Sequence, residues 1–362
     1  KKADKLHKPL PEDYLNSITS QIKNRTLNLD EFTCRLEKAS IFRKIRLAYA
    51  LKFRLHQNGS IVYRIRTGRG WATDFKWVRE WNGDVRQALS AVLDSIAADI
   101  RPNVEGKSIF IPRNVHYALP ATEKQFTGNL PTGSYVSVPE DLIVGIHWFN
   151  TNRRIDLDLS LIGQSGKIGW DGAYRTGSGS VLFSGDVTDA PRPDGASELF
   201  YFKKNTDEPR ILNVNYFNFD KDDAVECKLI AAQDTPGKRF GTNYLVDVNK
   251  IVAQANLNIS RKQSLLGLII KAGGENRVYF ANVSIGNSIT ASANTGAFHA
   301  RNYLVAYTSN SLNLKTVLEM AGAEVIDEFA EGEGQIDLSP SSLDKSTIIN
   351  LLRTTTSVVS TG

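Results

Sequence analysis

Apolar residues in the first part of the chain follow the spacing of helices. Within residues 11–56 they recur every three or four positions, as they do along one face of a helix. The two stripes are Tyr14, Ile18 and Ile22, then Ile41, Ile45, Ala48 and Leu51. Asp30, placed before Phe32 and Leu36, is a candidate helix start. We therefore expect a helical region at this end of the chain.

A short strand and one more helix are predicted to follow. After a turn at Asn58-Gly59, alternation over residues 61–66 places the isoleucines and Tyr63 on one face and two arginines on the other. A helix is expected over residues 85–100, ended by Pro102 because proline disfavours helix continuation. Its predicted inward residues are Leu89, Val92, Leu93 and Ile96.

From Ser108 the apolar period changes to two. Short alternating segments separated by Gly, Pro, Asn and Asp continue to about Asn287, a pattern that favours an antiparallel β-sandwich. Helical patterns return at residues 312–320 and at 339–352, where Ser339-Pro340 is a typical helix opening. The predicted fold is multidomain and mainly β. It has a basic, mainly helical region with a β-hairpin or wing over 1–125, a sandwich over 126–310 and a helical tail over 311–362.

Composition indicates a globular protein. Of the 362 residues, 41% are hydrophobic and 23% are charged, and no apolar run is long enough to span a bilayer or to act as a signal peptide. We therefore predict a cytoplasmic protein without a membrane span. Cys34 and Cys227 fit neither a disulfide framework nor a zinc site, so two free thiols are expected. The chain begins with lysine rather than methionine, so it is interpreted as a possible part of a longer polypeptide.

Carboxylates are concentrated in two places between residues 156 and 198. Asp156 and Asp158 lie two residues apart on a leucine-rich segment, so a strand sends both to one side. Further acids follow in turn-rich loops at Asp186, Asp189, Asp194 and Glu198. Calcium takes about six to eight oxygen ligands, commonly from flexible loops. For any one of these aspartates, a solvated turn is the better explanation. A pair of carboxylates on an apolar strand favours a bound cation, because unpaired buried charge is costly.

The same segments resemble the TerD family of tellurium-resistance and stress-response proteins, in its long multidomain form. The resemblance covers about 160 residues and is carried by these segments: 130–139, 146–148, 155–161, 184–189, 265–270 and 278–280. It implies a β-sandwich that binds Ca²⁺ through acidic loops. By motif position the ligand role falls on Asp156, Asp158 and Asp186, and then on Asp189, Asp194 and Glu198. Residues 190–193, Ala-Pro-Arg-Pro, interrupt the acidic run that is typical of the family, so the sequence does not decide whether a second calcium site is present.

Positive charge is concentrated at the other end of the chain. Between Arg35 and Arg69 the sequence has ten Lys and Arg residues and a single acid, interleaved with aromatic residues. A cationic helix followed by a hairpin could lie on phosphates in the manner of a winged helix. The candidate contacts are Arg43, Lys44, Arg46, Arg64, Arg66 and Arg69. A surface that docks onto an acidic protein partner explains the same charge.

No catalytic constellation can be recognised in the sequence. The five histidines are scattered without ligand spacing, and no nucleophile elbow or phosphate loop occurs. Asp186 with Asp189 could hold magnesium for phosphoryl transfer, yet no phosphate cradle accompanies them. We therefore expect a non-enzymatic, calcium-binding scaffold with protein partners or self-assembly. The resemblance implies a role in bacterial defence against tellurite, phage or colicins, and nucleic-acid association is the alternative.

Overall fold

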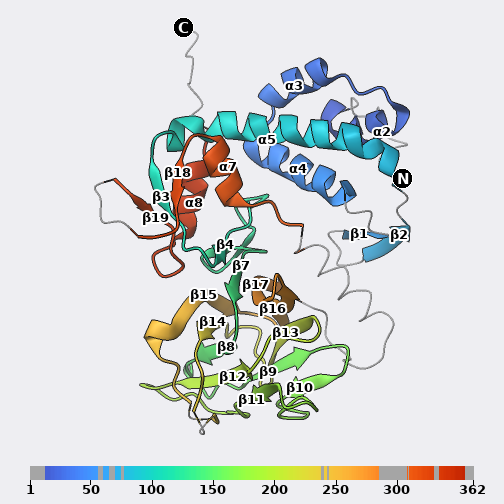
Figure 1. The fold of residues 1–362 in the computed structure, drawn as a ribbon. Helices are drawn as coiled ribbons and strands as arrows, with labels where there is room; N and C mark the ends of the chain where they lie inside the picture. The colour runs from blue at the N-terminus through green and yellow to red at the C-terminus, as the bar shows by residue number, and fades with distance from the viewer. Residues whose placement is uncertain are drawn as a thin grey trace. The chain divides into compact units, whose positions relative to one another are not determined.

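The chain divides into two compact units. The computed structural model describes residues 13–55, 60–64, 70–74, 77–237, 240–242, 244–284, 308, 310–329 and 334–354. Unit 1 comprises residues 1–103 and 352–362, and unit 2 comprises residues 104–351. Each unit is considered by itself below (Figure 1).

Unit 1 is mainly helical, as its apolar stripes predict. Its first helices are α2 (Tyr14–Asn24), α3 (Leu29–Glu37) and α4 (Ile41–Leu55). All four residues of the second predicted stripe are buried in α4. The expected helix start at Asp30 is wrong by two residues. Asn28 caps α3, because its side-chain oxygen accepts a hydrogen bond from the backbone N–H of Glu31 at 3.0 Å.

The long helix of this unit is longer than predicted at both ends. A 3₁₀ turn, η1 (Arg79–Trp81), leads into α5 (Asn82–Val104), and Pro102 lies inside the helix rather than ending it. Proline lacks the N–H that would donate to the carbonyl four residues earlier, and the helix nevertheless continues for two residues beyond it. The buried stripe of α5 is Val85, Ala88, Val92, Ile96, Ile100 and Val104. Leu89 and Leu93, both predicted to point inward, are only partly buried.

The predicted hairpin is present in unit 1. Strands β1 (Ser60–Arg64) and β2 (Gly70–Asp74) pair antiparallel, with Ser60 opposite Asp74 and Arg64 opposite Gly70. The predicted turn at Asn58-Gly59 and the arginines Arg66 and Arg69 lie outside the described residues.

Two antiparallel sheets make up most of unit 2, which confirms a sheet-rich, multidomain fold. The seven-stranded sheet runs in the order β10 (Lys167–Gly169), β9 (Leu157–Ile162), β13 (Arg210–Tyr216), β16 (Gln263–Ala272), β17 (Glu275–Ser284), β7 (Tyr135–Val138), β4 (Val115–His116). The five-stranded sheet runs in the order β11 (Val181–Phe183), β12 (Ala196–Phe202), β8 (Leu142–Trp148), β14 (Val225–Gln233), β15 (Ile251–Ile259). A small pair, β5 (Phe126–Thr127) and β6 (Leu130–Pro131), contacts both β17 and β15.

An extended segment covers one face of the five-stranded sheet. Ile143, Leu199, Tyr201 and Ala232 form a buried cluster on this face. The connection between β14 and β15 supplies Phe240, Tyr244 and Val246 against that cluster, and it ends in the 3₁₀ turn η2 (Val248–Lys250). Burial of aromatic and aliphatic surface at about 25 cal/mol per Å² holds this segment, residues 240–248, against the sheet. We call it the strap.

The remaining part of unit 2 is a small α/β module that the sequence patterns did not predict. Its three strands, β3 (Ser108–Phe110), β18 (Glu324–Ile326) and β19 (Ile336–Asp337), form a parallel sheet with β3 in the middle. Helices α7 (Leu314–Met320) and α8 (Lys345–Leu352) accompany it (Figure 1). β3 therefore does not start the antiparallel sandwich. The late helix begins at Lys345 rather than at Ser339-Pro340.

Both antiparallel sheets are inserted into this module. The chain leaves the module after β3 and returns to it before α7. The segment that leaves and the segment that returns are paired with each other. Ala118 forms an antiparallel bridge with Asn313, and the N–H of Leu119 donates to the carbonyl of Leu312 at 2.8 Å. The compact units divide near residues 103 and 351, and the predicted boundaries at 125 and 310 lie inside unit 2.

We expect the module to fold without the insert. Replacing residues 120–311 by a short glycine-rich linker should leave a folded α/β protein together with unit 1, because the ends to be joined are hydrogen-bonded neighbours. Far-ultraviolet circular dichroism and a cooperative thermal transition would test this. A shortened protein without cooperative unfolding would contradict the insertion, provided that it remains soluble.

Candidate metal centre

Two of the predicted ligands come from one strand segment. Asp156 immediately precedes β9 and Asp158 lies within it, while Leu157 and Leu159 between and after them are fully buried. The period-two alternation therefore places both carboxylates on the same side, as the sequence predicts. β13 pairs with β9 such that Asn215 lies opposite Asp158. The amide of Asn215 donates to Asp158 Oδ2 at 2.8 Å and fixes that carboxylate.

A loop from the other sheet delivers the third carboxylate. Asp186 follows β11 and comes after Gly185, whose φ of +118° is strained for residues with a side chain. A Cβ placed at Gly185 would lie 2.6 Å from Thr242 Cγ2 of the strap, so a larger residue there would push the loop away. The guanidinium of Arg154 binds the carbonyl of Thr188 at 2.5 Å and holds the loop further along.

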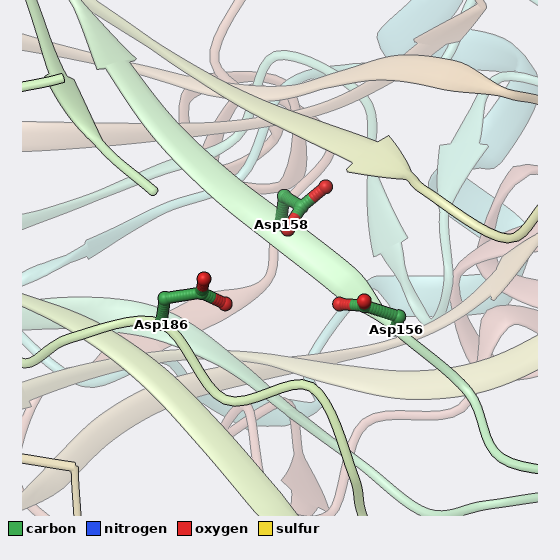
Figure 2. Close-up of side chains that lie close together, drawn as sticks. All are labelled: Asp156, Asp158 and Asp186. Carbon is green, nitrogen blue, oxygen red and sulfur yellow. The ribbon is translucent and has the colours of Figure 1, made fainter. Parts of the chain in front are cut away.

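The three carboxylates converge on one point. One oxygen from each of Asp156, Asp158 and Asp186 lies within 4.8 Å of the other two. In Figure 2 the side chains of Asp156 and Asp186 point toward each other from the strand and the loop, with Asp158 beside them. We call this set the acidic triad. Such a group could hold a metal ion.

Unsatisfied oxygen atoms indicate that a cation fits the acidic triad. Asp156 Oδ1 and Asp186 Oδ1 are buried and lack a hydrogen-bond partner among the described residues. A buried carboxylate oxygen without a donor costs free energy that a divalent cation would recover. Burial raises the pKa of all three carboxyls, and that of Asp158 rises to about 7. The charges of Asp156 and Asp186 add to the effect on Asp158, whereas Asn215 opposes it.

Asparagines fix the backbone that carries Asp156. Asn218 accepts from the N–H of Asp156 at 3.2 Å and donates to the carbonyl of Arg154 at 2.7 Å. Asn150 accepts from the N–H groups of Ile155 and Ala190. It so ties the segment before β9 to the loop of residues 184–195 between β11 and β12, which we call the acidic loop. Neither asparagine was predicted from the sequence, although asparagine side chains in loops often accept from backbone N–H groups in this way.

Glu198 has a role different from the predicted one. It is fully buried on β12, and its two oxygens accept from the N–H of Leu159 at 2.6 Å and of Val187 at 3.0 Å. β10 pairs only with the later half of β9, so the N–H of Leu159 has no strand partner on that side. Glu198 therefore closes a gap in the sheet and joins it to the acidic loop. Burial raises its pKa well above the usual range, and the two backbone donors oppose this.

Asp189 and Asp194 do not belong to the acidic triad. Both are exposed, and the Asp189 carboxylate accepts from the amide of Asn150 at 2.8 Å. At Asp194 the backbone carbonyl, not the side chain, is the group in contact, at 2.9 Å from His147 Nε2. The proline-containing interruption at residues 190–193 carries the chain away between the two. These two aspartates are therefore loop residues outside the acidic triad, and their ligand role stays a prediction.

Two of the predicted phosphate contacts in unit 1 are engaged elsewhere. Lys44 is 1% exposed, and its ammonium lies 2.6 Å from Asp99 Oδ2. Its place on α4 explains the error, because position 44 is on the same helical face as Ile41 and Ala48. Arg43 pairs with Asp13. Arg46 is exposed, the side chain of Arg64 is not described, and Arg66 and Arg69 lie outside the described residues. Nucleic-acid binding stays a prediction that rests on these last four residues.

Other chemistry in the described part of the chain is limited. His147 is hydrogen-bonded to the loop carbonyl of Asp194, and Cys227 is buried in β14. None of the helices in the described ranges combines the length and the apolar composition that crossing a bilayer requires. Comparison of the chain with protein-family models and with curated proteins gave no match.

Proposed function

We propose that residues 126–284 form a TerD-like calcium-binding sandwich that acts as a scaffold for partners in a bacterial stress or defence response. The observation that carries the proposal is the acidic triad, in which two buried carboxylate oxygens have no hydrogen-bond partner among the residues that the structure describes. The motif segments that resemble the TerD family contain all three of these aspartates. That agreement between motif and geometry supports the family assignment beyond the resemblance alone.

We favour calcium over the smaller magnesium ion because the family resemblance implies it. One oxygen of each carboxylate lies within 4.8 Å of the other two, a separation that two metal–oxygen bonds of roughly 2.0 to 2.6 Å can bridge, so the geometry admits either ion. Magnesium requires near-ideal octahedral geometry and retains several waters, whereas calcium accepts a more irregular set of oxygens. The cation would neutralise three like charges and tie the loop of Asp186 to β9. A rigid loop surface of this kind favours recognition of a partner, because less ordering remains to be done on binding.

Calorimetric titration of the full chain tests the proposal. We expect one calcium site in the wild type, and loss of at least about 100-fold in affinity when Asp156→Asn and Asp158→Asn are combined, because two of three anionic ligands become neutral. Asp222→Asn is the matched control, since Asp222 is an exposed loop aspartate with a 3.9 Å contact to Lys221. No calcium heat in the wild type, or equal heats in the double variant, would end the calcium proposal. Titration with magnesium alone measures selectivity.

A further inference from the structure

Phe217 exposes an aromatic ring beside the acidic triad. The residue is 59% exposed and follows β13 directly, and its backbone N–H donates to the carbonyl of Asp156 at 3.0 Å. Asn215, two residues earlier, binds Asp158 Oδ2 through its amide, so this side of β13 is the side of the acidic triad. Side chains two residues apart on an extended chain share one side. Phe217 therefore lies across from Asp156 as a cross-strand neighbour on that side.

A second aromatic ring contacts Phe217 from the loop after β10. The ring of Trp170 meets that of Phe217 edge-on, with 6.1 Å between centroids. Burial raises the pKa of Asp158 to about 7, and Asp171, the residue after Trp170, is among the charges that add to this rise. The loop after β10 therefore lies beside the acidic triad as well. Asp171 pairs with Lys167, so these two residues together bring no net charge.

A cation in the acidic triad would keep free coordination positions. Three carboxylates that each give one oxygen supply fewer than the six to eight oxygens that calcium takes. Asp156 is only 9% exposed, and its Oδ1 has no hydrogen-bond partner in the part of the chain that the structure describes. Asp186 is the most exposed of the three aspartates, so the group is open toward solvent on its side. The free positions can therefore take oxygen atoms from a ligand in solution.

The charge around the acidic triad disfavours anionic ligands. Residues 153–158, 185–195 and 217–223 together contain eight aspartates and four arginines and lysines. A divalent cation cancels two of the four surplus negative charges, so this end of the sandwich stays negative when the site is loaded. Phosphates and carboxylates are repelled by such a surface. A ligand that brings neutral oxygen atoms meets no such repulsion.

We propose that the calcium-loaded acidic triad and Phe217 together bind a carbohydrate. The inference rests on the calcium site proposed above. Two neighbouring hydroxyls of a pyranose ring complete the coordination of the cation and donate hydrogen bonds to the carboxylates that hold it. The apolar face of the sugar packs on the exposed ring of Phe217, which Trp170 supports from behind. A peptide carbonyl supplies one oxygen and no donor, so it fits these positions less well.

Saturation-transfer difference NMR on the full chain tests this proposal. The probes are the methyl glycosides of mannose, glucose and galactose, which differ in the arrangement of their hydroxyls. We expect saturation transfer to the ring protons of at least one glycoside in calcium and none in EGTA. Phe217→Ala should weaken glycoside binding about tenfold, because the stacking surface is lost. Phe329→Ala is the matched control, since Phe329 is 58% exposed and belongs to the α/β module.

Calorimetry on the same samples separates the two proposals. Phe217→Ala should bind calcium as tightly as the wild type, because only its backbone N–H contacts Asp156 and this group is retained. Calcium binding without saturation transfer to any of the three glycosides overturns the carbohydrate proposal and leaves the calcium site intact. Transfer that persists in EGTA, or that Phe217→Ala retains in full, also overturns it. Absence of calcium binding by the wild type overturns both proposals.

Discussion

Glu198→Ala should destabilise the protein by about 2–6 kcal/mol, because two buried backbone donors each lose their acceptor at a cost of roughly 1–3 kcal/mol. The donors are the N–H groups of Leu159 and Val187, which lie on β9 and on the acidic loop. Chemical denaturation followed by tryptophan fluorescence would measure the loss. We also expect weaker calcium binding, since the loop of Asp186 would no longer be tied to β9.

Glu226→Ala is the matched control for this variant. Glu226 is an exposed glutamate on the neighbouring part of the same sheet, in β14, so its loss should change the free energy of unfolding by about 0.5 kcal/mol or less. If Glu198→Ala were as stable as this control, Glu198 would not act as the link between the sheets. An intermediate stability is expected for Glu198→Gln, whose amide keeps one acceptor oxygen.

Saturating calcium should stabilise the protein most above neutral pH. At about 100 times the dissociation constant, mass action adds roughly 2.7 kcal/mol to the free energy of unfolding. The folded-state pKa of Asp158 is about 7 against an ordinary value of 3.8, so the cation-free folded state holds an extra proton between these values. The contribution of this carboxyl to stability therefore falls as pH rises through that window and stays low above about pH 7. Calcium binds the deprotonated carboxylates and should oppose this loss.

Thermal unfolding in calcium and in EDTA, at about pH 5.5 and pH 8, measures the stabilisation by calcium and its dependence on pH. We expect the calcium-induced rise in melting temperature to be small at the lower pH, where protons compete for Asp158. Asp158→Asn should be more stable than the wild type in EDTA at the higher pH, because its neutral amide keeps the Asn215 contact without a buried charge. An unchanged difference between calcium and EDTA across this range would argue against Asp158 as a ligand.

Local pattern and the family resemblance together predicted the acidic triad. Alternation placed Asp156 and Asp158 on one side of a strand, and the motif position of Asp186 in the TerD-like segment added the third carboxylate. Glu198 was assigned to the wrong group because an acid within an acidic stretch looks like a ligand. The residues after Glu198 indicated burial instead, because it precedes four consecutive apolar residues of β12. Buried acids need donors, and the nearest donors were backbone N–H groups.

The α/β module could not be predicted from local pattern. Its central strand β3 pairs with β18 and β19, which follow it by more than 200 residues, and each strand is only two or three residues long. Short apolar runs do not distinguish parallel from antiparallel pairing. Lys44 is a different kind of error, because the stripe at Ile41, Ile45 and Ala48 already placed it on the inward face. There, charge composition was given more weight than helical position.

The antiparallel bridge between Ala118 and Asn313 also bears on the order of folding. For β3 to meet β18 across an unfolded connection of about 200 residues, loop closure would cost roughly 4–5 kcal/mol by the (3/2)RT ln n relation. Once the inserted sheets have formed, their two ends are already adjacent, and the effective loop shrinks to a few residues. The parallel sheet should therefore close last, so the slowest steps in the folding of this chain belong to its long-range β pairings.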